Sequence, residues 1–142
     1  MIDGLSCDFP HLKKSTKASS PPTPEYNCIA WALNKIDEFW WPHPEAVWPM
    51  SSPEEETISA FQMTFSIFGY EPCENGQLES DYEKIALYAK NNRPKHAARQ
   101  LKNGKWTSKC GSSVDLEHEL HELEGERYGQ VVMYFRRKRS NQ

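Results

Sequence analysis

Cys28 is the residue of this sequence whose type and position best suit covalent chemistry. It opens the apolar run YNCIAWAL over residues 26–33. Asn27 is a good N-cap, so we expect a helix over residues 27–35 with Cys28 in its first turn. The positive end of the helix dipole and the free backbone amides of a first turn favour the thiolate, which is the nucleophilic form of cysteine. The pattern therefore indicates a nucleophile at Cys28.

A nucleophilic cysteine also needs a base, usually a histidine, within hydrogen-bond reach. His96 is the preferred base because it begins an expected strand, and a strand holds its side chain in a fixed direction. The backbone amide of Cys28, at a helix N-terminus, is a natural donor to the oxyanion that forms during acyl transfer. The other histidines of the sequence are His11, His43, His118 and His121.

The elements that must position this pair are helices in the first half of the chain and strands in the second. The Asn103-Gly104 pair is a strong hairpin signal, and Gly69 ends an apolar stripe with helical spacing. The expected elements are, in order, helix 27–35, an aromatic loop 39–49, helix 53–68, loop 71–81, strands 84–89, 95–101 and 105–109, helix 114–124 and strand 130–135. Helices followed by an antiparallel meander indicate an α+β domain.

The length of 142 residues allows one domain with one modest core. We expect an extended or flexible lead-in over 1–25, a single domain over 26–137 and a basic and polar tail over 138–142. The net charge of -3 gives no general attraction to nucleic acid or to anionic lipid, so neither is an expected partner. The basic run Arg136–Arg139 is interpreted as a solvated strand end.

The sequence contains no apolar stretch of the ~18 residues that a membrane helix needs, and no secretory signal. We therefore expect a cytoplasmic protein, with secretion by a route without a signal left open. In a reducing compartment the cysteines at positions 7, 28, 73 and 110 are expected to be free thiols. No CxxC pair occurs, which argues against a zinc ribbon and a thioredoxin-like redox site.

Three segments resemble the NlpC/P60 type of papain-like cysteine hydrolase. They are Asn27-Cys28, the run HAARQLKNGKW that His96 begins, and Tyr128-Gly129-Gln130-Val131. The chain also resembles a second domain family, marked by YNCIAWAL, HAARQLKNGKWTSK and a DLEH segment, which implies no activity. The NlpC/P60 resemblance implies a papain-like α+β fold, in which N-terminal helices pack on an antiparallel β-meander. It also implies that Cys28 is the nucleophile and His96 the base, then the acid.

The third catalytic residue of the NlpC/P60 type lies on the strand after the hairpin, and the matching residue here is Ser108. A serine orients a histidine more weakly than a carboxylate or an amide does. Asp115 or Glu117 in the following segment is an alternative, so the third member stays open. Tyr26 is expected to contribute a hydroxyl group to the cleft.

Two further groups of residues have both a structural and a functional interpretation. Trp40, Trp41 and Trp48 are typical of core or loop packing, but beside a cleft they would suit stacking on sugars or clamping of peptide side chains. His118 and His121 would form half a metal site on the expected helix, but the i, i+3 spacing and the lack of a third ligand argue against it. No metal and no cofactor are expected.

The residues favour a small cysteine hydrolase or acyltransferase that acts on an amide bond, as a peptidase, amidase or deamidase. The expected partner is a peptide or another amide-containing substrate. Two alternatives stay open, a catalytically inactive papain-like interaction module and a small bacterial effector or toxin domain. The sequence does not determine the oligomeric state.

Overall fold

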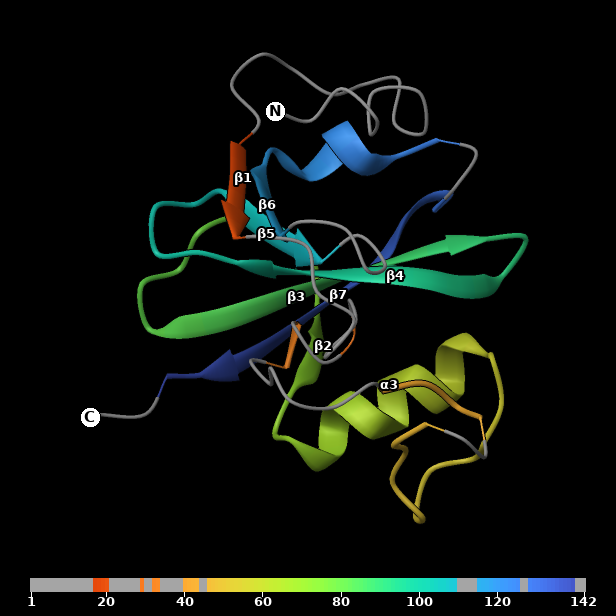
Figure 1. The fold of residues 1–142 in the computed structure, drawn as a ribbon. Helices are drawn as coiled ribbons and strands as arrows, with labels where there is room; N and C mark the ends of the chain where they lie inside the picture. The colour runs from red at the N-terminus through yellow and green to blue at the C-terminus, as the bar shows by residue number, and fades with distance from the viewer. Residues whose placement is uncertain are drawn as a thin grey trace.

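The computed structural model describes residues 17–20, 29, 32–33, 40–43, 46–109, 115–125 and 128–139 (Figure 1). Within these ranges the chain forms a seven-stranded sheet, a short α-helix and one 3-10 turn. The elements are β1 (Lys17–Ser20), α3 (Ile58–Ile67), β2 (Glu71–Cys73), β3 (Tyr82–Lys90), β4 (Arg93–Gln100), β5 (Trp106–Lys109), β6 (Asp115–His118), η1 (Leu120–Leu123) and β7 (Gln130–Lys138).

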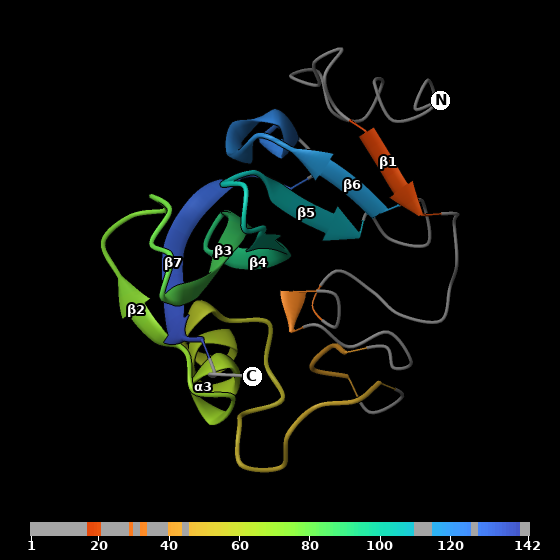
Figure 2. The ribbon, with the colours of Figure 1, turned by 90° about the vertical axis from the view of Figure 1, so that its left-hand side faces the viewer.

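The strands follow the order β1-β6-β5-β4-β3-β7-β2, and all neighbours are antiparallel. The long strands β3, β4 and β7 form the centre. β5 pairs with β4 only at Arg99 and Gln100, so β1, β6 and β5 turn away from the central strands (Figure 2). Among the described residues, the edge of β4 that precedes Arg99 therefore has no strand partner.

Local turn chemistry explains the central hairpins. Asn91 and Asn92 both have positive φ angles, of 52° and 64°, as a two-residue turn between right-twisted strands requires. β4 consequently begins at Arg93, two residues before the expected strand 95–101. At the next hairpin Gly104 has a φ of +89°, and the predicted turn at Asn103 and Gly104 is confirmed.

α3 begins later than its sequence suggested. Thr57 caps it by accepting a hydrogen bond from the Ala60 amide at 3.2 Å. Ser52, which directly precedes the expected helix 53–68, donates to the carbonyl oxygen of Ala60 at 2.9 Å and accepts from Thr64 at 2.8 Å, which fastens the preceding loop to the helix. The helix ends where predicted, because Gly69 takes a φ of +90° directly after the last turn.

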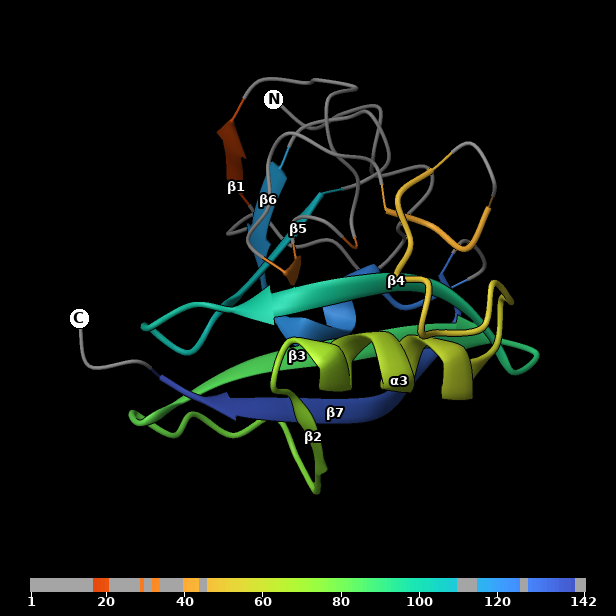
Figure 3. The same ribbon diagram turned by 90° about the horizontal axis from the view of Figure 1, so that it is seen from below.

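The two faces of the central sheet carry separate hydrophobic cores. α3 covers one face, and η1 lies on the opposite side (Figure 3). The core beneath α3, the helix-side core, contains Ile29, Ala32, Leu33, Trp40, Phe61, Phe65, Tyr70, Ile85, Leu87, Ala97 and Phe135. The core on the η1 side, the turn-side core, contains Ala86, Tyr88, Ala98, Trp106, Leu123 and Tyr128.

The predicted papain-like α+β fold, with N-terminal helices packed on a meander, is wrong. The described residues form mostly an antiparallel sheet, and α3 is a short helix of ten residues. The expected helix over 114–124 is β6 followed by the single 3-10 turn η1. β6 pairs with β5 on one side and β1 on the other, and these hydrogen bonds override a local apolar spacing that suits a helix.

Two segments that we expected to be irregular contribute strands. Part of the predicted loop 71–81 forms β2, which pairs with β7. Part of the predicted lead-in 1–25 forms β1, which pairs with β6. In the described part of the chain, no helix is both long enough and apolar enough to cross a membrane.

Candidate active site

His96 lies on β4 and is completely buried on the turn-side face of the sheet. Its ring stacks on the ring of Tyr128, with centroids 4.1 Å apart and planes 3° apart. The ring of Tyr88, the cross-strand partner of His96, meets it edge-on at 5.2 Å. The structure therefore fixes the His96 imidazole on a central strand, as the sequence predicted, and adds two phenol rings that the prediction missed.

Cys28 and Tyr26 lie outside the described residues, but the chain directly after Cys28 is described at three positions. The amide of Leu33 donates to the carbonyl oxygen of Ile29 at 3.1 Å, which is the i to i-4 bond of an α-helix. Ile29 and Ala32 are completely buried. A helical turn thus follows Cys28, in agreement with the predicted helix.

The helical turn after Cys28 contributes to a core that also contains the chain neighbour of His96. Ile29 belongs to the helix-side core together with Ala97, which is the neighbour of His96 on β4. Successive residues of a strand point to opposite faces, so Ala97 and His96 face opposite sides. Among the described residues, the stretch of β4 that holds both has no partner on β5.

Ser108, the expected third catalytic residue, is engaged elsewhere. Its hydroxyl group is completely buried and lies 2.7 Å from Nε2 of His118. Nδ1 of His118 lies 2.7 Å from the carbonyl oxygen of Glu119, so Nδ1 donates there and Nε2 accepts from Ser108. Burial lowers the pKa of His118 and keeps it neutral. Ser108 therefore bridges β5 and β6, and its expected role beside His96 stays a prediction.

Asp115 and Glu117, the alternative third members, lie on β6. β5 lies between β6 and β4 in the sheet, and Asp115 pairs with Lys109, the last residue of β5. A role for either carboxylate at His96 stays a prediction.

The three tryptophans pack around α3. Trp40 meets Phe68 edge-on at 5.5 Å, and Trp41 and Trp48 contact the ring of Phe61 at 5.3 and 5.0 Å. Their described ring contacts are those of a loop packed over a core. A substrate-binding role for these residues stays a prediction.

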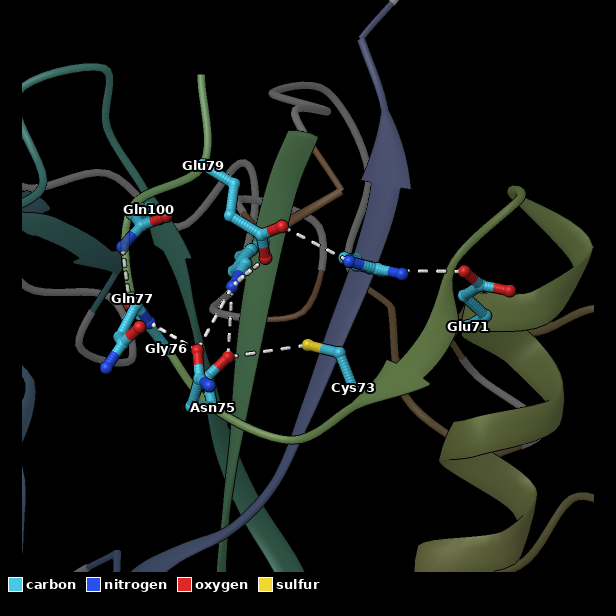
Figure 4. A network of polar contacts seen from close by, with 9 residues as sticks. Glu71, Cys73, Asn75, Gly76, Gln77, Glu79 and Gln100 are labelled. Atoms are coloured by element: carbon cyan, nitrogen blue, oxygen red, sulfur yellow. Dashed lines mark hydrogen bonds and ion pairs between the residues drawn. The ribbon is translucent and has the colours of Figure 1, made fainter. Parts of the chain in front are cut away.

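A polar network that the sequence did not indicate lies on the turn-side face (Figure 4). Lys84, near the start of β3, is 1% exposed, and its ammonium group lies 2.7 Å from Glu79 and 3.2 Å from the carbonyl oxygen of Asn75. The bond from Lys84 lowers the pKa of the Glu79 carboxyl group. Gln100 donates to the carbonyl oxygen of Gly76 at 2.7 Å. These bonds fasten the loop after β2 to the sheet.

A groove of about 730 Å³ opens between this loop and η1. Trp106, Leu120, Gln77, Glu119 and His121 are among its lining residues. His118 and His121, expected on one helix face, are separated, because His118 is buried on β6 and His121 pairs with Glu124 at 2.9 Å. Among the described residues, no three His, Cys, Asp or Glu side chains are grouped to hold a metal ion.

Residues 17–136 match a family described as a domain of unknown function, DUF7689. The chain belongs to this family. The DUF7689 match begins at β1, inside the predicted lead-in, and covers β1 to β6 and β7 as far as residue 136. No curated protein and no solved structure matches the chain.

Proposed function

We propose that this DUF7689 protein is a cysteine hydrolase or acyltransferase that acts on amide bonds, with Cys28 as nucleophile and His96 as base. The observation that carries the proposal is the packing of the helical turn after Cys28 into the same core as Ala97, the neighbour of His96. The proposal keeps the chemistry expected from the sequence, but it places that chemistry on a mostly antiparallel sheet instead of a papain-like fold.

The surroundings of His96 suit a base that is held in one orientation. Its ring is completely buried and is held by aromatic contacts on a central strand. A fixed, water-excluded imidazole exchanges protons with the group placed against it rather than with solvent. Such a ring suits proton transfer from a thiol to the amine of a substrate when both lie against it.

The proposed reaction has two steps. The proton of the Cys28 thiol moves to His96, and the thiolate attacks the carbonyl carbon of the amide. The carbon–nitrogen bond then breaks, and the amine leaves with the proton from His96, so a thioester remains on Cys28. Water, or another amine in an acyl transfer, attacks the thioester and regenerates the thiol.

We further propose a cytoplasmic location and a peptide or another amide-containing molecule as substrate. A reducing compartment keeps a cysteine nucleophile as a free thiol, which the reaction requires. Cys73, the cysteine that the structure describes, is a free, half-buried thiol.

The test is the pH dependence of alkylation at Cys28. We expect iodoacetamide to modify Cys28 rapidly below pH ~7, because a thiol paired with a histidine forms its thiolate well below the ordinary value. His96→Ala should slow the modification at pH ~6 by at least about tenfold. Peptide mass spectrometry of the full-length protein would measure the rate at each cysteine.

Two controls separate pairing from unfolding. His43→Ala removes an exposed loop histidine and should leave the Cys28 rate unchanged. The rate at Cys73 in the same samples reports whether a substitution has opened the fold. A Cys28 midpoint near pH ~8.5 that is the same in wild type and His96→Ala would overturn the proposal.

A second candidate function is ligand binding without covalent chemistry, and the groove lined by Trp106 and Leu120 favours it. An aromatic ring and an apolar side chain beside hydrogen-bonding groups are typical of small-molecule sites. This candidate becomes the better one if Cys28 reacts as an ordinary thiol.

A further inference from the structure

The ring of His96 lies against two phenol rings from different elements. Tyr88 comes from β3 and is completely buried, and Tyr128 precedes β7 and is 7% exposed. The hydroxyl group of Tyr88 donates to the carbonyl oxygen of Leu120, which fixes this ring from the η1 side. Tyr128 covers the flat face of the imidazole.

A pair of glycines fixes the position of Tyr128. Gly125 and Gly129 exchange two backbone hydrogen bonds, of 2.9 and 2.8 Å. Gly129 has a φ of +76°, and a Cβ atom there would lie 2.0 Å from the carbonyl oxygen of Ala89. The backbone beside Tyr128 is therefore pressed against the end of β3, which leaves little freedom for the Tyr128 ring to leave its stack.

The parallel stack has a chemical consequence for a histidine base. The face of an aromatic ring is electron-rich and attracts a cation that lies over it. When the Cys28 proton moves to His96, the neutral imidazole becomes an imidazolium directly over the Tyr128 ring. The stack thus favours the protonated His96, and so the Cys28 thiolate, while it keeps the ring in one orientation.

We propose that Tyr128 is the positioning residue of His96, held by the Gly125–Gly129 pair, and that it stabilises the imidazolium formed during the reaction. The role at Cys28 rests on the proposed function, whereas the effect on the His96 ring does not. Tyr128 acts in place of the third residue that we expected at Ser108, which instead binds His118.

The first readout is the titration of the His96 ring carbon signal by NMR in the full-length protein. Tyr128→Phe keeps the stacked ring and should leave the midpoint within about 0.3 pH unit. Tyr128→Leu removes the ring and should move the midpoint down by about one unit. Pentafluorophenylalanine at position 128 keeps the size but reverses the charge distribution of the ring. This variant should also move the His96 midpoint down, and it serves as the test if Tyr128→Leu does not fold.

The second readout is the alkylation of Cys28 against pH in the same proteins. In Tyr128→Leu the midpoint of Cys28 alkylation should move up by about one pH unit, while the rate at Cys73 stays as in wild type.

An unchanged His96 midpoint in both the leucine and the pentafluorophenylalanine variants would overturn the inference. If the His96 midpoint moves but Cys28 reacts as an ordinary thiol in wild type, the stack is established and the proposed function fails. If Cys28 is alkylated rapidly below pH ~7 but its alkylation midpoint does not change with the residue at position 128, the proposed function stands and the positioning role is refuted.

Discussion

At the scale of single residues, the burial of His118 makes the stability of the fold depend on pH. Its ring is 1% exposed and bonds to Ser108 and to the backbone of Glu119. Burial lowers the pKa of His118, and the weaker opposing influences come from the bond to Glu119 and the charges of Glu122 and Glu119. The folded protein therefore keeps this ring neutral at a pH where the unfolded chain already binds a proton.

The free energy of unfolding should fall as the pH drops below about 6.5, the ordinary value for histidine. The unfolded state takes up the proton first, and the loss continues down to the lowered pKa of the folded state, at up to about 1.4 kcal/mol per pH unit. His118→Gln removes this contribution, so its stability should fall less between pH ~7 and ~5 than that of the wild type. Urea unfolding at a series of pH values would measure the difference.

His121→Gln is the matched control for this prediction. The His121 side chain is 69% exposed, so its replacement removes a histidine outside the core and should leave the free energy of unfolding at pH ~7 within about 0.5 kcal/mol of the wild type. Equal slopes for the wild type and His118→Gln would show that His118 is not the group responsible.

At the scale of elements, the close contact between Gly129 and the end of β3 leaves no room for a side chain at position 129. Gly129→Ala combines a positive φ with a Cβ atom 2.0 Å from the Ala89 carbonyl oxygen, so the backbone must move. We expect it to lower the free energy of unfolding by about 3 kcal/mol or more. Urea unfolding measured by circular dichroism would test this.

Gly104→Ala is the control at a second turn. Gly104 has a similar φ of +89°, but its nearest atom to a new Cβ, in Leu78, lies 3.7 Å away. Only the backbone conformation is unfavourable there, which costs about 1 kcal/mol. Equal losses for the two variants would mean that the chain around Gly129 relaxes, and that the glycine pair does not hold Tyr128 in place.

At the scale of the whole molecule, Arg137 on β7 joins three elements. Its guanidinium group bonds to Glu83 of β3 at 2.8 Å and to the carbonyl oxygen of Phe68, after α3, at 2.9 Å. It also lies 4.5 Å over the ring of Tyr70, whose pKa burial raises to about 12. The basic run that we interpreted as a solvated strand end therefore ties the helix to the sheet.

Arg137→Ala should lower the free energy of unfolding by about 1–3 kcal/mol, because it removes charged hydrogen bonds at a half-buried site. Arg137→Lys should recover only part of this loss, since an ammonium group cannot reproduce the planar fork of bonds. Thermal unfolding would measure both. Lys138→Ala, at the exposed neighbouring position, is the control, and a loss as large there as at Arg137 would contradict the assignment.

The sequence by itself determined the features that depend on neighbouring residues. The central strands and the Asn103-Gly104 turn were predicted, because strand periodicity and turn chemistry are local properties. The end of α3 at Gly69 and the place of His96 on a strand follow for the same reason. These positions already separate His96 from the other histidines as a candidate base.

The tertiary structure alone decided which distant groups meet. It made a strand and a 3-10 turn of residues 115–123, because β5 and β1 supply hydrogen bonds that an isolated helix cannot use. It brought Ser108 within hydrogen-bond distance of His118 and stacked the ring of Tyr128 on the ring of His96. Such partners depend on the register between strands far apart in the chain and on the competition for buried bonds, which local residue patterns do not record.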